Sequence, residues 1–135
     1  MSIIDNGVRV IIVWAMLAAA GAASAQSPLA PAPGFFPNSA KGERLYQEKC
    51  ASCHGKDLRG TDKGPPQIHI YYVPNHHSDV AYQLAVRNGV RQHHWRFGDM
   101  PPVPGLTPED VGHITAFIRR EQKNAGLDMN AGMRH

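Results

Sequence analysis

The sequence predicts an all-α protein of three to four short helices. Three segments carry apolar residues at helical spacing, namely 39–49, 78–88 and the stretch that begins at Thr107. No segment of useful length alternates apolar and polar residues, as a half-buried strand would. The chain has 135 residues, which allows one domain.

The first helix is expected from Ser39 to Lys49, because Asn38 or Ser39 can cap its first turn. Small, apolar and amphipathic residues share one face of this segment at helical spacing. They are Gly42, Leu45, Tyr46 and Lys49. This face is therefore expected to pack against another helix.

The second helix is expected from Ser78 to Asn88, with Ser78 as the cap and Gly89 as the stop. Its predicted apolar face consists of Val80, Ala81, Leu84 and Ala85. The segments on either side, 55–75 and 93–105, contain Gly, Pro and Asp without a sustained period, so both are predicted to be long loops.

The third helix has the clearest start. Thr107 provides a cap, Pro108 suits the first helical position, and the acidic Glu109 and Asp110 suit the positive end of the helix dipole. Its apolar stripe consists of Val111, Ile114, Phe117 and Ile118. Arg119, Arg120 and Lys123 occupy the last turns, and Gly126 can end the helix.

The overall composition excludes several classes of protein. Apolar residues make up 42% and charged residues 19%, which is typical of a globular protein. Two Cys are too few for a disulfide-rich scaffold or for a four-thiolate zinc site. The net charge is +3 and no dense run of Lys and Arg occurs, so a nucleic-acid-binding surface is not expected.

The N-terminal residues 1–25 are expected to be a signal peptide. Arg9 precedes the apolar run 10–20, and Ala23-Ser24-Ala25 offers the small residues that a signal peptidase accepts. An uncleaved membrane anchor is the alternative. Cleavage predicts a periplasmic protein with no stable membrane insertion, made of a Pro/Ala-rich leader (26–38), one domain (39–126) and a flexible tail (127–135).

The predicted helices alone form a poor core. Aromatic residues make up only 7% of the chain, and two long loops separate short helices. Such an arrangement buries too little apolar surface to offset the loss of chain entropy on folding. A large, flat, apolar group is therefore expected at the centre.

The motif Cys50-Ala51-Ser52-Cys53-His54 identifies that group. C-x-x-C-H is the attachment signature of c-type haem, in which two thiols can add to the haem vinyl groups and the histidine offers an axial nitrogen to iron. A thioredoxin-like redox motif would need a βαβ context, which is not visible. A zinc site would need two further ligands at matched spacing.

From Ser39 to about Lys123 the chain resembles the class I monohaem cytochromes c. The resemblance is carried by Gly42-x-x-x-Tyr46-x-x-x-Cys50-x-x-Cys53-His54-Gly55. It implies the cytochrome c fold, with short helices wrapped around one covalent haem c. It also implies that Gly42 lets the first and last helices cross closely and that Tyr46 packs there against Phe117.

The resemblance extends to both faces of the haem. Gly64-Pro65 is similar to the family loop whose proline carbonyl accepts a hydrogen bond from the ligand imidazole, here His54. Family members usually have a leucine soon after that proline, whereas this chain has Pro66-Gln67-Ile68. Met100, followed by Pro101, is similar to the family's sixth ligand, although a methionine here could also be a core residue.

Five further histidines lie between the haem motif and the last helix: His69, His76, His77, His93 and His94. They can be exposed or contact the haem propionates, and one of them could replace Met100 on the iron. The two adjacent pairs could also hold a second metal such as copper or zinc.

Other polar residues have two interpretations each. Some of Tyr71, Tyr72, Arg87, Arg91 and Trp95 are expected to contact the propionates or to pack on the haem, although a solvated surface charge is the simpler reading of each Arg. Positive residues near the motif could steer an acidic redox partner, or could form a plain solvated face. They are Lys41, Lys49, Lys56, Arg59 and Lys63.

These features predict a monomeric one-electron carrier rather than an enzyme. It would shuttle electrons between a periplasmic or membrane donor, such as a dehydrogenase, and an oxidoreductase or terminal oxidase of a respiratory chain. One alternative is a haem-based sensor or small enzyme whose sixth iron position is open. The other is a metal-handling module that uses the paired histidines.

Overall fold

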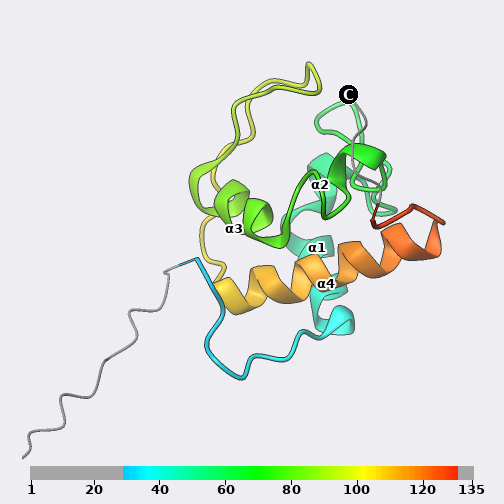
Figure 1. Ribbon diagram of the computed structural model, residues 1–135. Helices are drawn as coiled ribbons and strands as arrows, with labels where there is room; N and C mark the ends of the chain where they lie inside the picture. Colours follow the sequence, from blue (N-terminus) through cyan, green and yellow to red (C-terminus); the bar gives the residue numbers. More distant parts are fainter. Residues whose placement is uncertain (1–28, 131–135) are drawn as a thin grey trace, which may run out of the picture.

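The computed structural model describes residues 29–130, which form four α-helices and one 3₁₀ turn (Figure 1). The elements are α1 (Ser39–Lys49), α2 (Ala51–His54), η1 (Ile70–Tyr72), α3 (Asp79–Asn88) and α4 (Pro108–Asn124). Within this range the only β-pairing is an isolated antiparallel bridge between Val90 and Met100. The all-α prediction is therefore confirmed. The predicted signal peptide lies outside the described residues.

Helix α1 has the predicted bounds, and Asn38 is its cap. The Asn38 side chain accepts a hydrogen bond from the Lys41 amide at 2.9 Å. The helix ends at Lys49. Cys50 is its C-cap, with an amide that donates to the Tyr46 carbonyl at 2.8 Å, and α2 follows at once. Because the two helices meet at Cys50, the first thiol of the C-x-x-C-H motif lies at a fixed junction.

Helix α4 begins with the predicted cap. The Thr107 hydroxyl accepts from the Asp110 amide at 3.2 Å, while the Asp110 carboxylate accepts from the Thr107 amide, so a full capping box forms. The predicted apolar stripe is buried, with at most 3% of each residue exposed. The helix ends at Asn124, and Gly126 follows with a φ of +78°.

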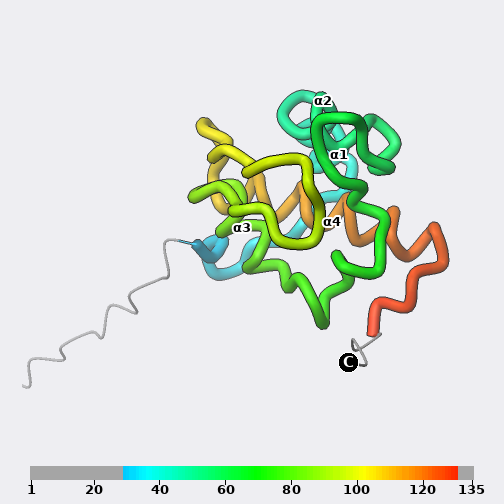
Figure 2. The backbone as a smooth tube through the Cα atoms, turned by 90° about the horizontal axis from the view of Figure 1, so that it is seen from above, coloured from blue at the N-terminus to red at the C-terminus, as the bar shows by residue number. Residues whose placement is uncertain are grey.

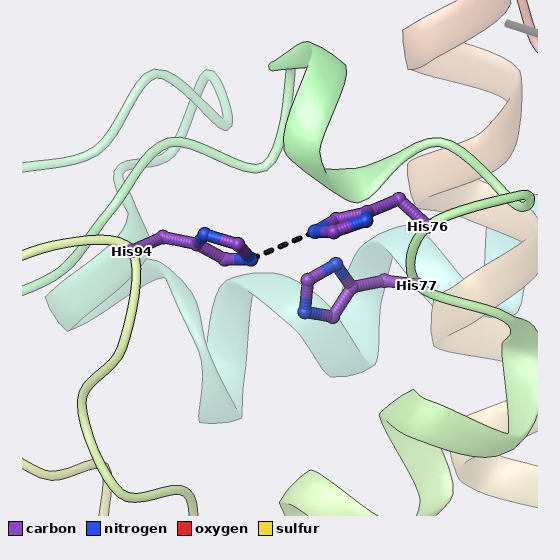
Figure 3. Close-up of side chains that lie close together, drawn as sticks. All are labelled: His76, His77 and His94. Carbon is purple, nitrogen blue, oxygen red and sulfur yellow. Dashed lines mark hydrogen bonds between the residues drawn. The ribbon is translucent and has the colours of Figure 1, made fainter. Parts of the chain in front are cut away.

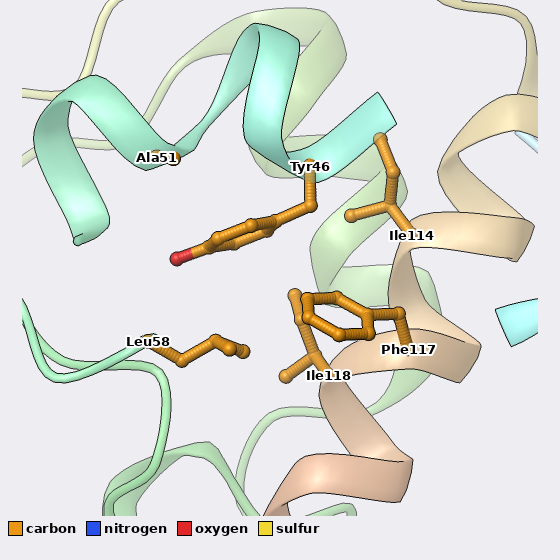
Figure 4. Close-up of a cluster of buried hydrophobic side chains, with 6 residues drawn as sticks. All are labelled: Tyr46, Ala51, Leu58, Ile114, Phe117 and Ile118. Carbon is orange, nitrogen blue, oxygen red and sulfur yellow. The ribbon is translucent and has the colours of Figure 1, made fainter. Parts of the chain in front are cut away.

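Helices α1 and α4 cross at very close range. A Cβ atom on Gly42 would lie 1.9 Å from the His113 carbonyl oxygen, so only glycine allows this approach. Beside the crossing, the Tyr46 and Phe117 rings pack with centroids 5.4 Å apart, as the resemblance implies. Figure 4 shows these rings with Ile114 and Ile118 of α4 on one side of the contact.

The core around this crossing also holds the segment that follows α2. Leu58 and Ala51 complete the cluster of buried apolar residues (Figure 4). The Tyr46 hydroxyl points away from α4 and donates to the Gly55 carbonyl at 2.9 Å. Tyr46 thus fastens the end of α2 to the pair of crossing helices.

Helix α3 corrects one prediction. Its expected apolar face does not pack into a core of side chains, because Val80 is 55% and Leu84 is 41% exposed. The only buried residue of this helix is Gln83, whose side-chain amide donates to the Pro108 carbonyl at 2.8 Å. The physical reason is that Leu84 and its small neighbours face a cavity, described below, rather than another helix.

Both views place α2 and α3 apart, on different sides of the α1–α4 crossing (Figures 1 and 2). The described part of the predicted leader runs along α4, where the Ala32 amide donates to Glu109 at 2.8 Å and Phe35 packs on His113. No helix within residues 29–130 is long and apolar enough to cross a membrane.

The crossing predicts that Gly42→Ala destabilises the folded protein by about 1–3 kcal/mol, because the new methyl group overlaps backbone that cannot move aside. Denaturant or thermal unfolding of the mature protein measures the loss. Gly112→Ala on α4 is the control, since its methyl group would meet side chains rather than backbone. They are the ring of Phe35, 2.7 Å away, which can turn, and Pro31 at an ordinary contact distance of 3.5 Å. Equal costs for both substitutions would contradict the close-crossing argument.

Candidate functional site

A cavity of about 590 Å³ lies between α1, α2, α3, α4 and the loop that joins α3 to α4. Much of its wall is apolar, with Val86, Val103, Val111, Ile114 and Ile118 among the lining residues. Both cysteines, His54 and Met100 also line it. The cavity therefore brings the predicted tether and both predicted axial ligands together in one place.

The two cysteines flank one helical turn, because Cys50 is the N-cap of the four-residue α2 and Cys53 lies within it. Cys50 is half-buried and Cys53 is exposed. Burial, together with the neighbouring Cys53, raises the pKa of Cys50 to about 11. A redox C-x-x-C site needs a thiol with a lowered pKa. The opposite shift here, in a chain segment without a βαβ unit, disfavours a thioredoxin-like function.

His54 ends α2, and its Nδ1 lies 2.9 Å from the Pro65 carbonyl oxygen. Burial lowers the pKa of His54, and the hydrogen bond to Pro65 partly opposes that shift. A neutral imidazole that donates from Nδ1 leaves Nε2 as the free lone pair. This is the form of histidine that binds a metal.

The Pro65 loop approaches α2 through Gly64. A Cβ atom on Gly64 would lie 2.9 Å from the Cys53 carbonyl oxygen. The Thr61 hydroxyl donates to that same carbonyl at 2.6 Å. The loop is thereby held against the haem motif, which keeps the Pro65 carbonyl within reach of His54.

Gln67 is a residue of this site that the sequence prediction did not include. Only 6% of it is exposed, and its side-chain amide lies 3.0 Å from His54 Nδ1. Its own backbone carbonyl accepts a hydrogen bond from Gln122 at 2.8 Å, which ties it to α4. The sequence contained one sign of this residue, because the chain has Pro66-Gln67-Ile68 where family members usually have a leucine. That difference did not indicate which group the Gln67 side chain contacts.

Met100 is held at the wall of the cavity by its backbone. The backbone amide and carbonyl of Met100 each form a 2.9 Å hydrogen bond with the backbone of Val90. The end of the loop after α3 therefore lies beside the beginning of that loop. Gly89 is needed there, because its φ is +74° and a Cβ atom would lie 2.4 Å from the Met100 carbonyl oxygen. The Val103 amide then donates to the Val86 carbonyl at 2.8 Å.

The predicted propionate contacts are only partly at the cavity. Tyr72, Arg91 and Trp95 line it, whereas Tyr71 and Arg87 do not. Tyr71 packs instead on the rings of His69, His94 and Trp95. Arg87 lines a separate, smaller pocket of about 310 Å³.

A buried polar atom at the cavity tests whether haem fits. The Trp95 indole Nε1 is buried and makes no well-formed hydrogen bond within the described residues. Burial raises the pKa of the nearby Tyr72, and an interaction with the Trp95 side chain partly opposes that shift. The Trp95 N–H is therefore a donor in need of an acceptor, on the largely apolar wall that also carries the two thiols and the His54 imidazole. A haem, whose propionates are acidic, fits such a wall.

Only some of the positive side chains and additional histidines lie at the cavity. Lys49 lines the cavity, while Lys41 forms an ion pair with Asp110 at 3.0 Å and belongs to the α1–α4 contact. Lys56, Arg59 and Lys63 are exposed on the loop after α2. Of the five additional histidines, the cavity is lined by His77, His93 and His94.

Comparison with known proteins agrees with this geometry. The family model for cytochrome c matches residues 39–121. The chain is 33% identical over 79 residues to the cbb3-type cytochrome c oxidase subunit CcoP of Rubrivivax gelatinosus, covering 57% of this chain and 24% of that protein. It is 31% identical over 85 residues to cytochrome c-551 of Bacillus subtilis (strain 168), covering 63% of this chain and 64% of that protein.

The chain thus spans about a quarter of the first relative and slightly less than two thirds of the second. The family match covers the crossing helices, the haem motif and the Met100 loop. Together with the cavity that joins these parts, it shows that the chain belongs to the cytochrome c family, as a small class I c-type cytochrome with covalently bound haem c.

Proposed function

We propose that this protein is a periplasmic one-electron carrier, in which Cys50 and Cys53 tether the haem and His54 and Met100 are its axial ligands. The observation that carries the proposal is the placement of all four side chains on the wall of one largely apolar cavity. The haem iron supplies the chemistry, because it takes up and releases a single electron. The chain determines the potential, the exposure and the docking.

Each part of the chain has a physical task in this function. The Pro65 carbonyl orients the His54 ring and makes its free nitrogen a stronger donor. A thioether ligand favours ferrous iron and raises the reduction potential. The bridge to Val90 holds the Met100 loop, so the thioether stays in place when the charge of the iron changes.

Docking is proposed to use the exposed positive side chains around the attachment site. Lys56, Arg59 and Lys63 follow α2, and Lys49 stands at the cavity. Such charges would steer an acidic redox partner into a small, short-lived interface. The proposed donor is a dehydrogenase or oxidoreductase, and the proposed acceptor is a reductase or terminal oxidase. The protein is proposed to lose residues 1–25, as a cleaved signal peptide, when it is exported.

A second candidate function is favoured by one observation. The cavity is lined by His77, His93 and His94 as well as by Met100. If the Met100 thioether does not bind the iron, the sixth position is open or is taken by an imidazole. The protein would then act as a haem-based sensor or small enzyme, or as a carrier of lower potential.

Substitution of Met100 separates these functions. Met100→Ala is expected to lower the reduction potential, to abolish the ferric thioether-to-iron charge-transfer band, and to let ferrous haem bind carbon monoxide. Potentiometry and optical spectra of the mature protein measure all three. Met129→Ala, in the tail, is the control and should change none of them. A potential that Met100→Ala leaves unchanged would assign the sixth position to a histidine or to solvent.

Gln67 is expected to raise the potential, because its side-chain Nε2, a donor, lies 3.0 Å from a His54 Nδ1 whose own hydrogen goes to the Pro65 carbonyl. The positive end of the amide dipole then faces the imidazole and disfavours ferric iron, so Gln67→Leu, which removes it, should lower the potential. Gln83→Leu is the matched control, because Gln83 is also buried but bonds Pro108 away from the cavity. The reduction potential of the Gln83→Leu variant should equal that of the unaltered protein. An unchanged or higher potential in Gln67→Leu would refute this role.

The two thiols are expected to be essential for the folded state. Cys50→Ala combined with Cys53→Ala should give a chain without covalent haem that fails to reach the native fold, because the cavity lacks its filling. Haem staining of denatured protein and far-ultraviolet circular dichroism test this. Ser52→Ala, between the two thiols, should retain the haem. A stable, folded double variant would show that the side chains alone form a sufficient core.

A further inference from the structure

The two histidine pairs, which are distant in the sequence, meet in space. His76 and His77 precede α3, whereas His93 and His94 lie on the loop that follows it. His76 Nε2 lies 2.8 Å from His94 Nε2, as the dashed line in Figure 3 shows. Donor atoms of His76, His77 and His94 all lie within 4.8 Å of one another. His93 joins the group, with its Nε2 3.4 Å from His77 Nε2.

The hydrogen bonds of these rings leave lone pairs aimed at one another. His77 Nδ1 lies at hydrogen-bond distance from the Tyr71 carbonyl, and His93 Nδ1 lies 3.0 Å from the Arg91 carbonyl. A carbonyl only accepts, so each Nδ1 must carry the hydrogen, and each Nε2 of the neutral rings is an unprotonated acceptor. Two acceptors cannot bond each other. A cation between them would satisfy both.

We propose that His76, His77 and His94, with His93 as a fourth ligand, form a binding site for one divalent transition-metal ion, copper(II) or zinc(II). Metal–nitrogen bonds of about 2.0–2.1 Å place neighbouring donor atoms about 2.9 Å apart at a right angle and about 3.4 Å apart at a tetrahedral angle. The nitrogen–nitrogen distances of His76–His94 and His77–His93, 2.8 and 3.4 Å, match that range. The wider spacing of up to 4.8 Å within His76, His77 and His94 would close by small turns of the rings when an ion binds. Imidazole nitrogen suits both ions, and copper(II) binds the tighter of the two.

For His77 and His94, the surroundings favour the neutral ring, which is the form that binds a metal. Burial is the main cause of the lowered pKa of His77 and of His94, and the neighbouring histidines lower both further. The Arg119 guanidinium also lowers the pKa of His77. Its charge is offset by Asp79, which it contacts at 2.9 Å.

The surrounding structure holds the ligands in position. Arg119 of α4 donates to the backbone carbonyls of Tyr72 and His77, which fixes the His76-His77 segment against the helix. On the other loop, the His94 ring stacks on Tyr71 with centroids 4.4 Å apart. The same Tyr71 offers its carbonyl to His77. Ligands on both loops are thus positioned through one aromatic residue and one arginine.

This site is distinct from the proposed axial ligands, although it adjoins their cavity. His77, His93 and His94 line the cavity, whereas His76 stands outside it. A set of four imidazoles that includes a residue outside the cavity is not explained by ligation of a single haem iron. The proposal does not depend on whether Met100 binds that iron.

The test uses mature haem protein that has been freed of loosely bound metal with a chelator. Equilibrium dialysis against zinc(II), and separately against copper(II), is expected to give one ion per chain, with copper held more tightly. Electron paramagnetic resonance of the copper(II) form is expected to show coupling to several nitrogens. His76→Gln and His94→Gln should each weaken binding at least tenfold, because each removes a ligand. His69→Gln, which lies nearby but outside the set, should bind as the unaltered protein does.

Three results would overturn the proposal. The first is the absence of stoichiometric binding of either ion by the unaltered protein. The second is equal binding by His94→Gln and His69→Gln. The third is a change in the haem spectrum of metal-free His94→Gln, since this would place the imidazole on the haem iron instead. An unchanged haem spectrum also shows that each variant is folded, so a loss of metal then reports on the site itself.

Discussion

The close approach of α1 and α4 at Gly42 is the contact on which the rest of the structure depends. Because no side chain separates the two backbones, the Tyr46 ring can reach Phe117 on one side and the Gly55 carbonyl on the other. That second bond places the end of α2, and with it the haem motif. A wider crossing would separate the thiols and His54 from the wall that α4 contributes to the cavity.

The cavity explains an arrangement that side chains alone would not stabilise. Helix α3 exposes Val80 and Leu84, and the loop after it is held by backbone hydrogen bonds more than by packing. Bound haem supplies the apolar surface that this side of the molecule lacks. The same cofactor therefore acts in the electron chemistry and in the stability of the fold.

Local signals in the sequence were sufficient for the three longer helices and for the attachment motif, but not for the short α2 or for η1. Caps at Asn38 and Thr107 and the spacing of the α4 stripe are short-range features, so they could be recognised without a structure. The exposed side of α3, the contact of Gln67 with His54 and the meeting of two histidine pairs depend on how distant loops fold back. Periodicity describes one element at a time and contains no information about such contacts.

The pairing of α1 with α4 has a consequence for how the protein matures. Contacts such as Gly42 with His113 close a loop that contains most of the domain, and closing a long loop costs chain entropy before the contact forms. Haem fixed at Cys50 and Cys53 and bound by a ligand near residue 100 would divide that loop into shorter ones. Cofactor attachment would then speed the docking of the terminal helices, so the rate of helix docking in the cell would follow the supply of haem.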